Sequence, residues 1–165
     1  MGADIHLVVE YSNTADYLLP TGLALVEWPR NTDLFVAMSG LWGHPSLIPA
    51  RGFPSPASFM ACKAYGVQVV RAGEVDSMLA APSILEEEAL AALGTGQSQF
   101  LPHLKDHISN PDYVWPTWLT RDEFLRCVAH SGVTLLGLDV DVTLGMLALI
   151  ESRGWYARMV FWFDV

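Results

Sequence analysis

The sequence predicts an α+β fold: a mainly antiparallel sheet with helices packed on one face and the N- and C-terminal strands central. Two observations indicate this fold. The opening segment, residues 4–11, alternates apolar and polar side chains with a period of two, the pattern of a β-strand. The closing segment, residues 157–164, alternates in the same way. Helical patterns lie between them without a regular strand–helix repeat, which is typical of the α+β class.

The two terminal strands carry ionisable side chains. In the first strand the apolar face holds Ile5, Leu7, Val9 and Tyr11. If the two strands are neighbours, their other faces form one polar surface, lined by Asp4, His6, Glu10, Arg158 and Asp164.

The first half of the interior contains strands, a short helix and an irregular stretch. Residues 23–28 predict a second strand, which forms an antiparallel hairpin with the first. Asn31 or Thr32 can cap a short helix that ends near Gly40. Prolines and glycines then interrupt residues 40–57. A helix to Tyr65 and a strand over 67–71 follow.

The second half is mainly helical. Pro82 fits the first turn of a helix that runs to about Leu93. Residues 94–118 have no predicted element, although residues 97–104 could hide a short helix or strand. A loop of that length is usually functional, disordered or a sign of a missed element, and this one could act as a lid. A capping box at Thr120 starts a helix that ends near Gly132, and residues 133–138 form a short apolar segment. The last helix starts at Asp139 or Asp141, and its apolar residues surround it, which predicts full burial.

Length and composition limit the class of protein. At 165 residues the chain suits a single domain, residues 1–165. Hydrophobic residues make up 52% and charged residues 16%, which indicates a thick core or a self-association surface, and we expect a homo-oligomer. No apolar run approaches the ~20 residues of a membrane-spanning helix, and the N-terminus lacks a signal pattern. Cys62 and Cys127 are predicted to be reduced and buried, in a cytoplasmic protein.

The formal net charge of −9 disfavours direct nucleic-acid binding and anionic membranes, since both need a basic footprint. It leaves open an acidic protein that imitates nucleic acid. The one dense acidic run, residues 86–88, is more typical of a solvated helix face.

The chain contains five short motifs: the opening Gly-x-Asp-Ile-His, Arg30-Asn31-x-x-Leu34-Phe35, Arg51-Gly52-Phe53-Pro54, Trp118-Leu119-Thr120 and the closing Val160-Phe161-Trp162-Phe163-Asp164. Together they resemble a family of small uncharacterised proteins of tailed bacteriophages and prophages. Ala3 stands where many members have cysteine, and residues 113–116 depart from the histidine and serine of that loop. The resemblance implies a viral setting in the host cytoplasm and no established activity. It draws attention to polar residues in motif positions: Asp4, His6, Arg30, Asn31, Arg51, Arg158 and Asp164.

Three arginines are candidates for anion binding. Arg30, Arg51 and Arg158 are three of only nine basic residues, and a guanidinium suits phosphate or carboxylate. The alternative is that each pairs internally with a carboxylate: Asp4, Glu10, Asp33 or Asp164.

Trp42 and Trp115 lie in proline-rich segments and could stack on a base or meet a partner. Asp4 and His6 could begin a metal site, but no further ligands have suitable spacing, so a polar network is favoured and no metal or cofactor is expected. His103, Asp106 and His107 are a weak loop site.

These features predict a binding protein that sequesters a small anionic, nucleotide-like ligand, which would suit evasion of host defence. The residues expected to bind are Asp4, His6, Arg30, Arg51, Trp42, Trp115, Arg158 and Asp164. One alternative is a nucleotide or phosphodiester hydrolase in which Asp4, His6 and Glu10 act as acid/base groups. The other is an acidic interaction module that inhibits a host protein complex.

Overall fold

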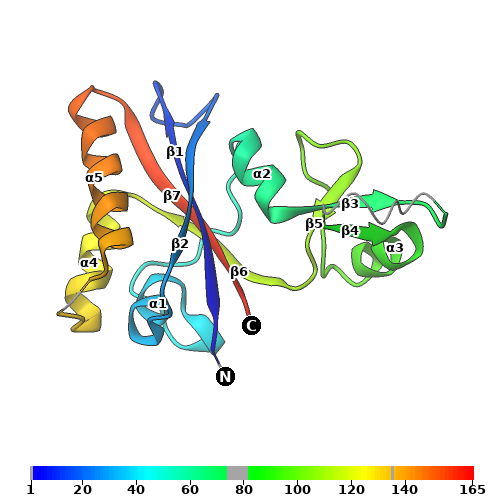
Figure 1. The fold of residues 1–165 in the computed structure, drawn as a ribbon, viewed down its shortest axis with the longest axis horizontal. Coiled ribbons are helices and arrows are strands. Elements are labelled where there is room, and N and C mark those ends of the chain that lie inside the picture. The colour runs from blue at the N-terminus through cyan, green and yellow to red at the C-terminus, as the bar shows by residue number, and fades with distance from the viewer. Residues whose placement is uncertain (1, 74–81, 135) are drawn as a thin grey trace. The chain divides into compact units, whose positions relative to one another are not determined.

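The computed structural model describes residues 2–73, 82–134 and 136–165 (Figure 1). Its contacts divide the chain into two compact units: unit 1 is Met1–Ala61 with Val114–Val165, and unit 2 is Cys62–Tyr113. We describe each unit by itself. The prediction of a single domain over residues 1–165 stays a prediction.

Unit 1 is built on a four-stranded sheet with the strand order β2-β1-β7-β6. The strands are β1 (Asp4–Ser12), β2 (Thr21–Trp28), β6 (Tyr113–Leu119) and β7 (Tyr156–Asp164). Both β2 and β7 pair with β1 in the antiparallel sense, as Figure 1 shows around the blue and red strands. The α+β fold and the central position of the two terminal strands are therefore confirmed.

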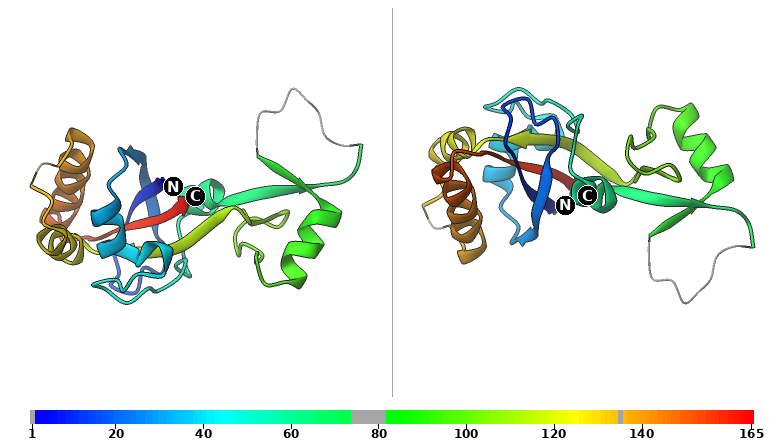
Figure 2. Two further views of the ribbon diagram at one scale, coloured as in Figure 1. Left: turned by 90° about the horizontal axis from the view of Figure 1, so that it is seen from below. Right: turned by 90° about the horizontal axis from the view of Figure 1, so that it is seen from above.

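Three helices cover one face of this sheet: α1 (Thr32–Ser39), α4 (Arg121–Ser131) and α5 (Leu138–Ser152). Asn31 caps α1, and Thr120 and Glu123 form the predicted capping box of α4. Figure 2 shows α4 and α5 (yellow and orange) side by side. The core between the sheet and these helices contains buried residues from both: Ile5, Leu7, Val9, Leu34, Phe35, Met38, Phe124, Cys127, Leu147, Phe161 and Phe163.

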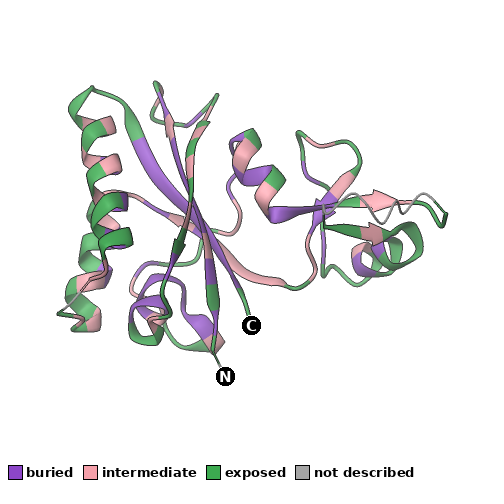
Figure 3. Ribbon diagram, viewed as in Figure 1, coloured by how far each residue is buried: buried purple, intermediate pink, exposed green. Residues whose placement is uncertain are grey.

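The second face of the sheet is also covered, which differs from the half-buried strand that the alternation predicts. Val8, Val160 and Trp162 have no exposed surface, although they lie opposite the helical layer. The segment before α2 (Phe59–Tyr65) supplies the cover, because the Phe53 ring packs edge-on against Trp162 with 6.1 Å between centroids. Figure 3 shows β7 buried along most of its length.

Helix α5 is not buried all round, which corrects the prediction from its sequence. Only Val140, Thr143 and Leu147 are buried, one turn apart on the face toward the core. Leu138, Val142 and Leu149 are exposed, so the opposite side of α5 carries apolar residues at the surface (Figure 3). The apolar residues of α5 are therefore divided between the face packed on the core and the face exposed at the surface.

Unit 2 contains a three-stranded sheet with the order β4-β3-β5, beside helix α3. The elements are β3 (Gly66–Val70), β4 (Ser83–Leu85), α3 (Glu86–Gly94) and β5 (His107–Ser109). Strand β3 pairs in parallel with β4 and antiparallel with β5. Val67, Ala89 and Ile108 form a small core of this unit.

Two segments differ from the prediction. Residues 83–85 form β4, so the helix predicted from Pro82 begins only at Glu86. The segment 94–118 contains β5 and most of β6 instead of one long loop. Within the predicted apolar segment 133–138, residue 135 lies outside the described residues. None of the helices in the described part of the chain is long and apolar enough to cross a membrane.

Candidate functional site

The polar residues of the two terminal strands do share one face. Strand pairing places Asp4 opposite Asp164 and Glu10 opposite Arg158. They do not form one exposed surface, because the two ends of this face differ in burial. Asp4 and Asp164 are exposed at one end, whereas Glu10 and Arg158 are almost completely buried at the other.

Glu10 and Arg158 form a buried ion pair, and both side chains also hydrogen-bond to backbone groups of the protein. Arg158 Nε donates to Glu10 Oε1 over 2.6 Å, and its Nη2 donates to the Pro56 carbonyl oxygen over 2.7 Å. The second carboxylate oxygen of Glu10 accepts from the Ser58 backbone N–H over 2.8 Å. A buried pair of this kind fixes the segment 56–58 on the sheet, because either charge alone would be strongly disfavoured there.

Aromatic rings extend this pair into a larger cluster. The Arg158 guanidinium lies 4.0 Å from the centroid of the Tyr17 ring and 5.1 Å from that of Trp118. The Arg51 guanidinium lies 4.1 Å from the same Trp118 ring. Cation–π contacts of this length are favourable, and more so when water is excluded. We call Glu10, Tyr17, Arg51, Trp118, Glu123 and Arg158 the arginine–tryptophan cluster.

Arg51 is held in the cluster by Glu123 at the start of α4. Its Nη1 donates to Glu123 Oε2 over 2.8 Å, its Nη2 donates to Oε1, and its backbone N–H donates to Thr117 Oγ1 over 3.1 Å. Burial alone would raise the pKa of Glu123, but hydrogen bonds from Arg51 and Thr120 outweigh it and the pKa is lowered. Both arginines of the cluster are thus neutralised by carboxylates of the same unit.

Arg30 pairs with Asp4 at the surface. Arg30 Nε and Nη2 donate to the two carboxylate oxygens over 2.6 and 2.8 Å, and both side chains are more than half exposed. The hydrogen bond from Arg30 lowers the pKa of Asp4, and the reciprocal bond raises that of Arg30. All three candidate arginines therefore make the internal ion pairs that the sequence left as an alternative. The partner of Arg51 is Glu123, which is not among the carboxylates predicted from the sequence.

His6 stacks on Trp162, with ring centroids 6.0 Å apart and an angle of 14° between the planes. Glu10 lies four positions after His6 on the same strand, which corresponds to roughly 13 Å at the rise of an extended strand. Asp4 and Glu10 each engage an arginine, so the three residues proposed for hydrolysis do not converge on one point.

Trp42 and Trp115 pack against the core of unit 1 while remaining partly exposed. Trp42 lies in the short 3₁₀ turn Leu41–Gly43, and Trp115 lies in β6 and not in a loop. Both have positive φ angles, 58° and 49°. Packing against the core therefore accounts for part of the surface of both residues.

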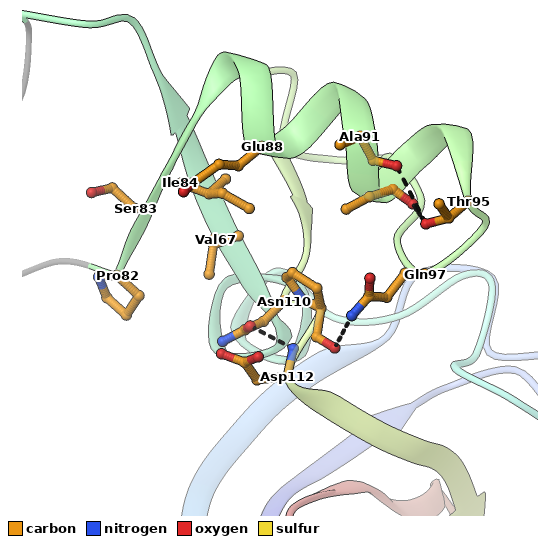
Figure 4. Close-up of a pocket in the computed structure, with 12 residues that line it drawn as sticks. Val67, Pro82, Ser83, Ile84, Glu88, Ala91, Thr95, Gln97, Asn110 and Asp112 are labelled. Atoms are coloured by element: carbon orange, nitrogen blue, oxygen red, sulfur yellow. Dashed lines mark hydrogen bonds between the residues drawn. The ribbon is translucent and has the colours of Figure 1, made fainter.

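One cavity of unit 2 has a volume of about 700 Å³ and lies between α3, β4 and the turn at residues 110–112. Figure 4 shows its lining, in which Val67 and Ile84 form the apolar part. Its polar part has two carboxylates, two side-chain amides and two hydroxyls: Glu88, Asp112, Gln97, Asn110, Ser83 and Thr95. The carboxylates make this cavity unfavourable for an anion.

A second cavity of unit 2, about 440 Å³, lies between β3 and α3, and we call it the β3–α3 cavity. Val69, Ala89 and Leu93 belong to its apolar part, and Phe100, which is 64% exposed, also lines it. Two cations line it, Arg71 and Lys105, together with Glu86 and Asp106. Sequence analysis missed this site. Its cations are 34 positions apart and form no motif, and only the pairing of β3 with β4 and β5 assembles its walls.

The weak loop site at His103, Asp106 and His107 is not a metal centre by geometry. His107 begins β5, and the described residues contain no group of three or more histidine, cysteine or acidic side chains that could hold a metal ion.

Comparison with known proteins adds no relative: no protein-family model, no curated protein and no solved structure matches this chain.

Proposed function

We propose that this protein binds and sequesters a small anionic, nucleotide-like ligand, and that the β3–α3 cavity holds it. The observation that carries this proposal is the meeting of Arg71, Lys105 and the exposed Phe100 around one apolar hollow. Guanidinium and ammonium groups suit phosphate, and an exposed aromatic ring suits a base.

The charges of the chain favour this cavity over the residues first singled out from sequence. Arg30, Arg51 and Arg158 each have a carboxylate within hydrogen-bonding distance. Lys105, in contrast, has no ion-pair partner in the part of the chain that the structure describes. Arg71 lies 3.9 Å from Glu86, and both side chains are more than half exposed. An exposed pair at that distance is weak, so a phosphate can take the place of Glu86.

The size and polarity of the cavity suit a mononucleotide. Its volume of about 440 Å³ falls within the range of small-molecule sites. Val69 and Leu93 can contact the flat face of a base, and Asp106 can accept hydrogen bonds from its amino group or from sugar hydroxyls.

Sequestration is favoured over hydrolysis because the hydrolase alternative depends on Asp4, His6 and Glu10. Both carboxylates of this set, Asp4 and Glu10, are bound to arginines, and the strand spacing separates His6 from Glu10. The phage-like motifs would make the ligand a host signal, and the benefit to a virus would be its removal from solution.

Thermal unfolding of the purified protein with linear and cyclic nucleotides tests the proposal. A ligand at ~100 times its dissociation constant adds about 2.7 kcal/mol of stability, and we expect such a shift with at least one nucleotide. The double variant Arg71→Glu/Lys105→Glu should abolish that shift. The matched control is Lys63→Glu/Arg126→Glu, which makes the same change in net charge at exposed cations outside the cavity.

Each outcome decides something. A shift that survives Arg71→Glu/Lys105→Glu would place the ligand elsewhere. A nucleotide recovered as cleaved product would favour the hydrolase, and no shift with any nucleotide would overturn the proposed function and favour the acidic interaction module.

A further inference from the structure

We infer that unit 1 binds a small amphiphilic carboxylate, an apolar chain that ends in one carboxylate group, in a hollow at the C-terminal end of α5. The hollow has a volume of about 390 Å³, within the range of small-molecule sites. We call it the Trp155 hollow, and it is lined by Tyr11, Leu23, Leu149, Ile150, Arg153 and Trp155. It shares no lining residue with the β3–α3 cavity, so this inference goes beyond the proposed function.

The lining of the Trp155 hollow is mainly apolar and aromatic. The rings of Tyr11 and Trp155 meet edge to face, with 5.3 Å between centroids and an angle of 67° between the planes. Ile150 packs partly against the core of unit 1, whereas Leu149 and Trp155 are 60% and 43% exposed. A ligand with an apolar body would remove this exposed surface from water, which is favourable. The lining therefore selects an apolar ligand body.

Arg153 supplies a positive charge that the fold does not use. Among residues 2–73, 82–134 and 136–165, no carboxylate forms an ion pair with Arg153. The nearby carboxylate of Glu151 accepts instead from Arg121 Nε over 2.6 Å. The end of α5 does not need the guanidinium as a cap either. The backbone N–H groups of Arg153 and Gly154 donate to the last carbonyls, over 3.1 and 2.9 Å. The Arg153 guanidinium is therefore available to an anion.

The turn between α5 and β7 brings this charge to the apolar lining (Figure 1). Gly154 has a φ of 77°, in the left-handed region that favours glycine. The chain reverses there, and Arg153 and Trp155, on either side of Gly154, line the same hollow. A ligand can thus place its charged group and its apolar body in one site.

The charge balance identifies the ligand as a monoanion. A guanidinium presents a planar pair of donors that matches the two oxygens of a carboxylate. Arg153 can neutralise one negative charge, and the other five lining residues supply no second cation. Because the chain has a net charge of −9, any further negative charge on the ligand is unfavourable. A carboxylate with an apolar chain fits these conditions, whereas a multiply charged nucleotide does not.

Calorimetric titration of the purified protein with straight-chain carboxylates tests the inference. Each methylene that leaves water should raise the affinity about fourfold from hexanoate to octanoate. Octanoate should bind about tenfold more tightly than 1-octanol, which lacks the charge. Octanedioate should bind more weakly than octanoate, because its second carboxylate has no cation in the hollow. The indole N–H resonance of Trp155, assigned by its loss in Trp155→Phe, should shift during the titration.

Two pairs of variants separate the charge from the apolar lining. Arg153→Met should bind octanoate no better than 1-octanol, whereas Arg126→Met, at an exposed arginine outside the hollow, should behave as the parent. Leu149→Gln should weaken the binding of both compounds, whereas Leu138→Gln, at an exposed leucine of the same helix outside the hollow, should weaken neither. Thermal unfolding of each variant establishes that it is folded.

Several results would overturn the inference. These are an octanoate affinity that is absent, that ignores chain length or that is equally reduced by Arg126→Met, and a Trp155 resonance that does not move. A dimeric parent that fails to bind octanoate would assign the hollow to a second copy, which also overturns it. None of these results depends on nucleotide binding, so failure here is distinct from failure of the proposed function.

Discussion

Arg158 and Glu10 meet in the interior over 2.6 Å although 148 positions separate them in the chain. Arg158→Met should lower the free energy of unfolding by about 3–5 kcal/mol, because it leaves the Glu10 carboxylate buried without its counter-charge. Urea unfolding measures this change. The double variant Glu10→Leu/Arg158→Met should recover part of the loss, since it removes both charges. A double variant that loses the sum of the two single losses would contradict this account.

Glu123 links the start of α4 to Arg51, and its contribution to the free energy of unfolding should depend on pH. Because its folded pKa is lowered, its contribution is present above the ordinary value of 4.5 and is lost as the pH falls through the folded pKa. Glu123→Gln should cost about 1–2 kcal/mol near neutral pH, because the hydrogen bonds with Arg51 lose their negative partner. Urea unfolding at neutral pH and near pH 3 should show this difference shrinking in acid. Glu87→Gln, at an exposed site with the same change of charge, should show no comparable pH dependence.

Tyr17 should limit stability in alkali. Burial raises its pKa to about 12, despite the opposing effect of Arg158. A raised folded pKa means that the contribution is complete below about pH 10 and is lost as the pH rises toward 12. Tyr17→Phe keeps the ring over Arg158 and removes the ionisation, so its melting temperature should fall less than that of the parent over this range. Equal alkaline losses in parent and variant would refute the assignment.

The two sides of α5 should respond differently to truncation. Leu147 is fully buried, and Leu147→Ala should cost about 2–5 kcal/mol through lost contacts and a residual cavity. Leu138 is exposed, and Leu138→Ala should change stability by no more than about 0.5 kcal/mol. Chemical denaturation of both variants checks the contrast, and similar losses would mean that both sides are buried.

Local patterns predicted much of the fold. Alternation with a period of two located both terminal strands, and the capping box at Thr120 located the start of α4. These signals succeed because strand alternation and helix capping depend on residues a few positions apart. The sequence could not show which carboxylate would form an ion pair with each arginine. Arg51 and Glu123 are 72 positions apart, and only the packing of their segments brings them together.

The errors have physical causes. Pro116 argued against a strand, yet β6 lies at the edge of its sheet, where a residue without an N–H is tolerated. The apolar residues around α5 indicated burial, but an apolar residue can equally serve a contact between molecules. The β3–α3 cavity left no pattern because its cations lie on exposed turns, where residue type is weakly constrained by folding.

The central place of β7 has a consequence for how the chain is made. Strand β1 is synthesised long before its second neighbour, which spans Tyr156–Asp164. Until those residues leave the ribosome, one edge of β1 has no strand to pair with. Before that point β1 can pair only with β2, in the hairpin. Pairings between distant segments form late, and unpaired apolar strands aggregate. A chain truncated before Tyr156 would therefore leave one edge of β1 unpaired and would be prone to aggregate.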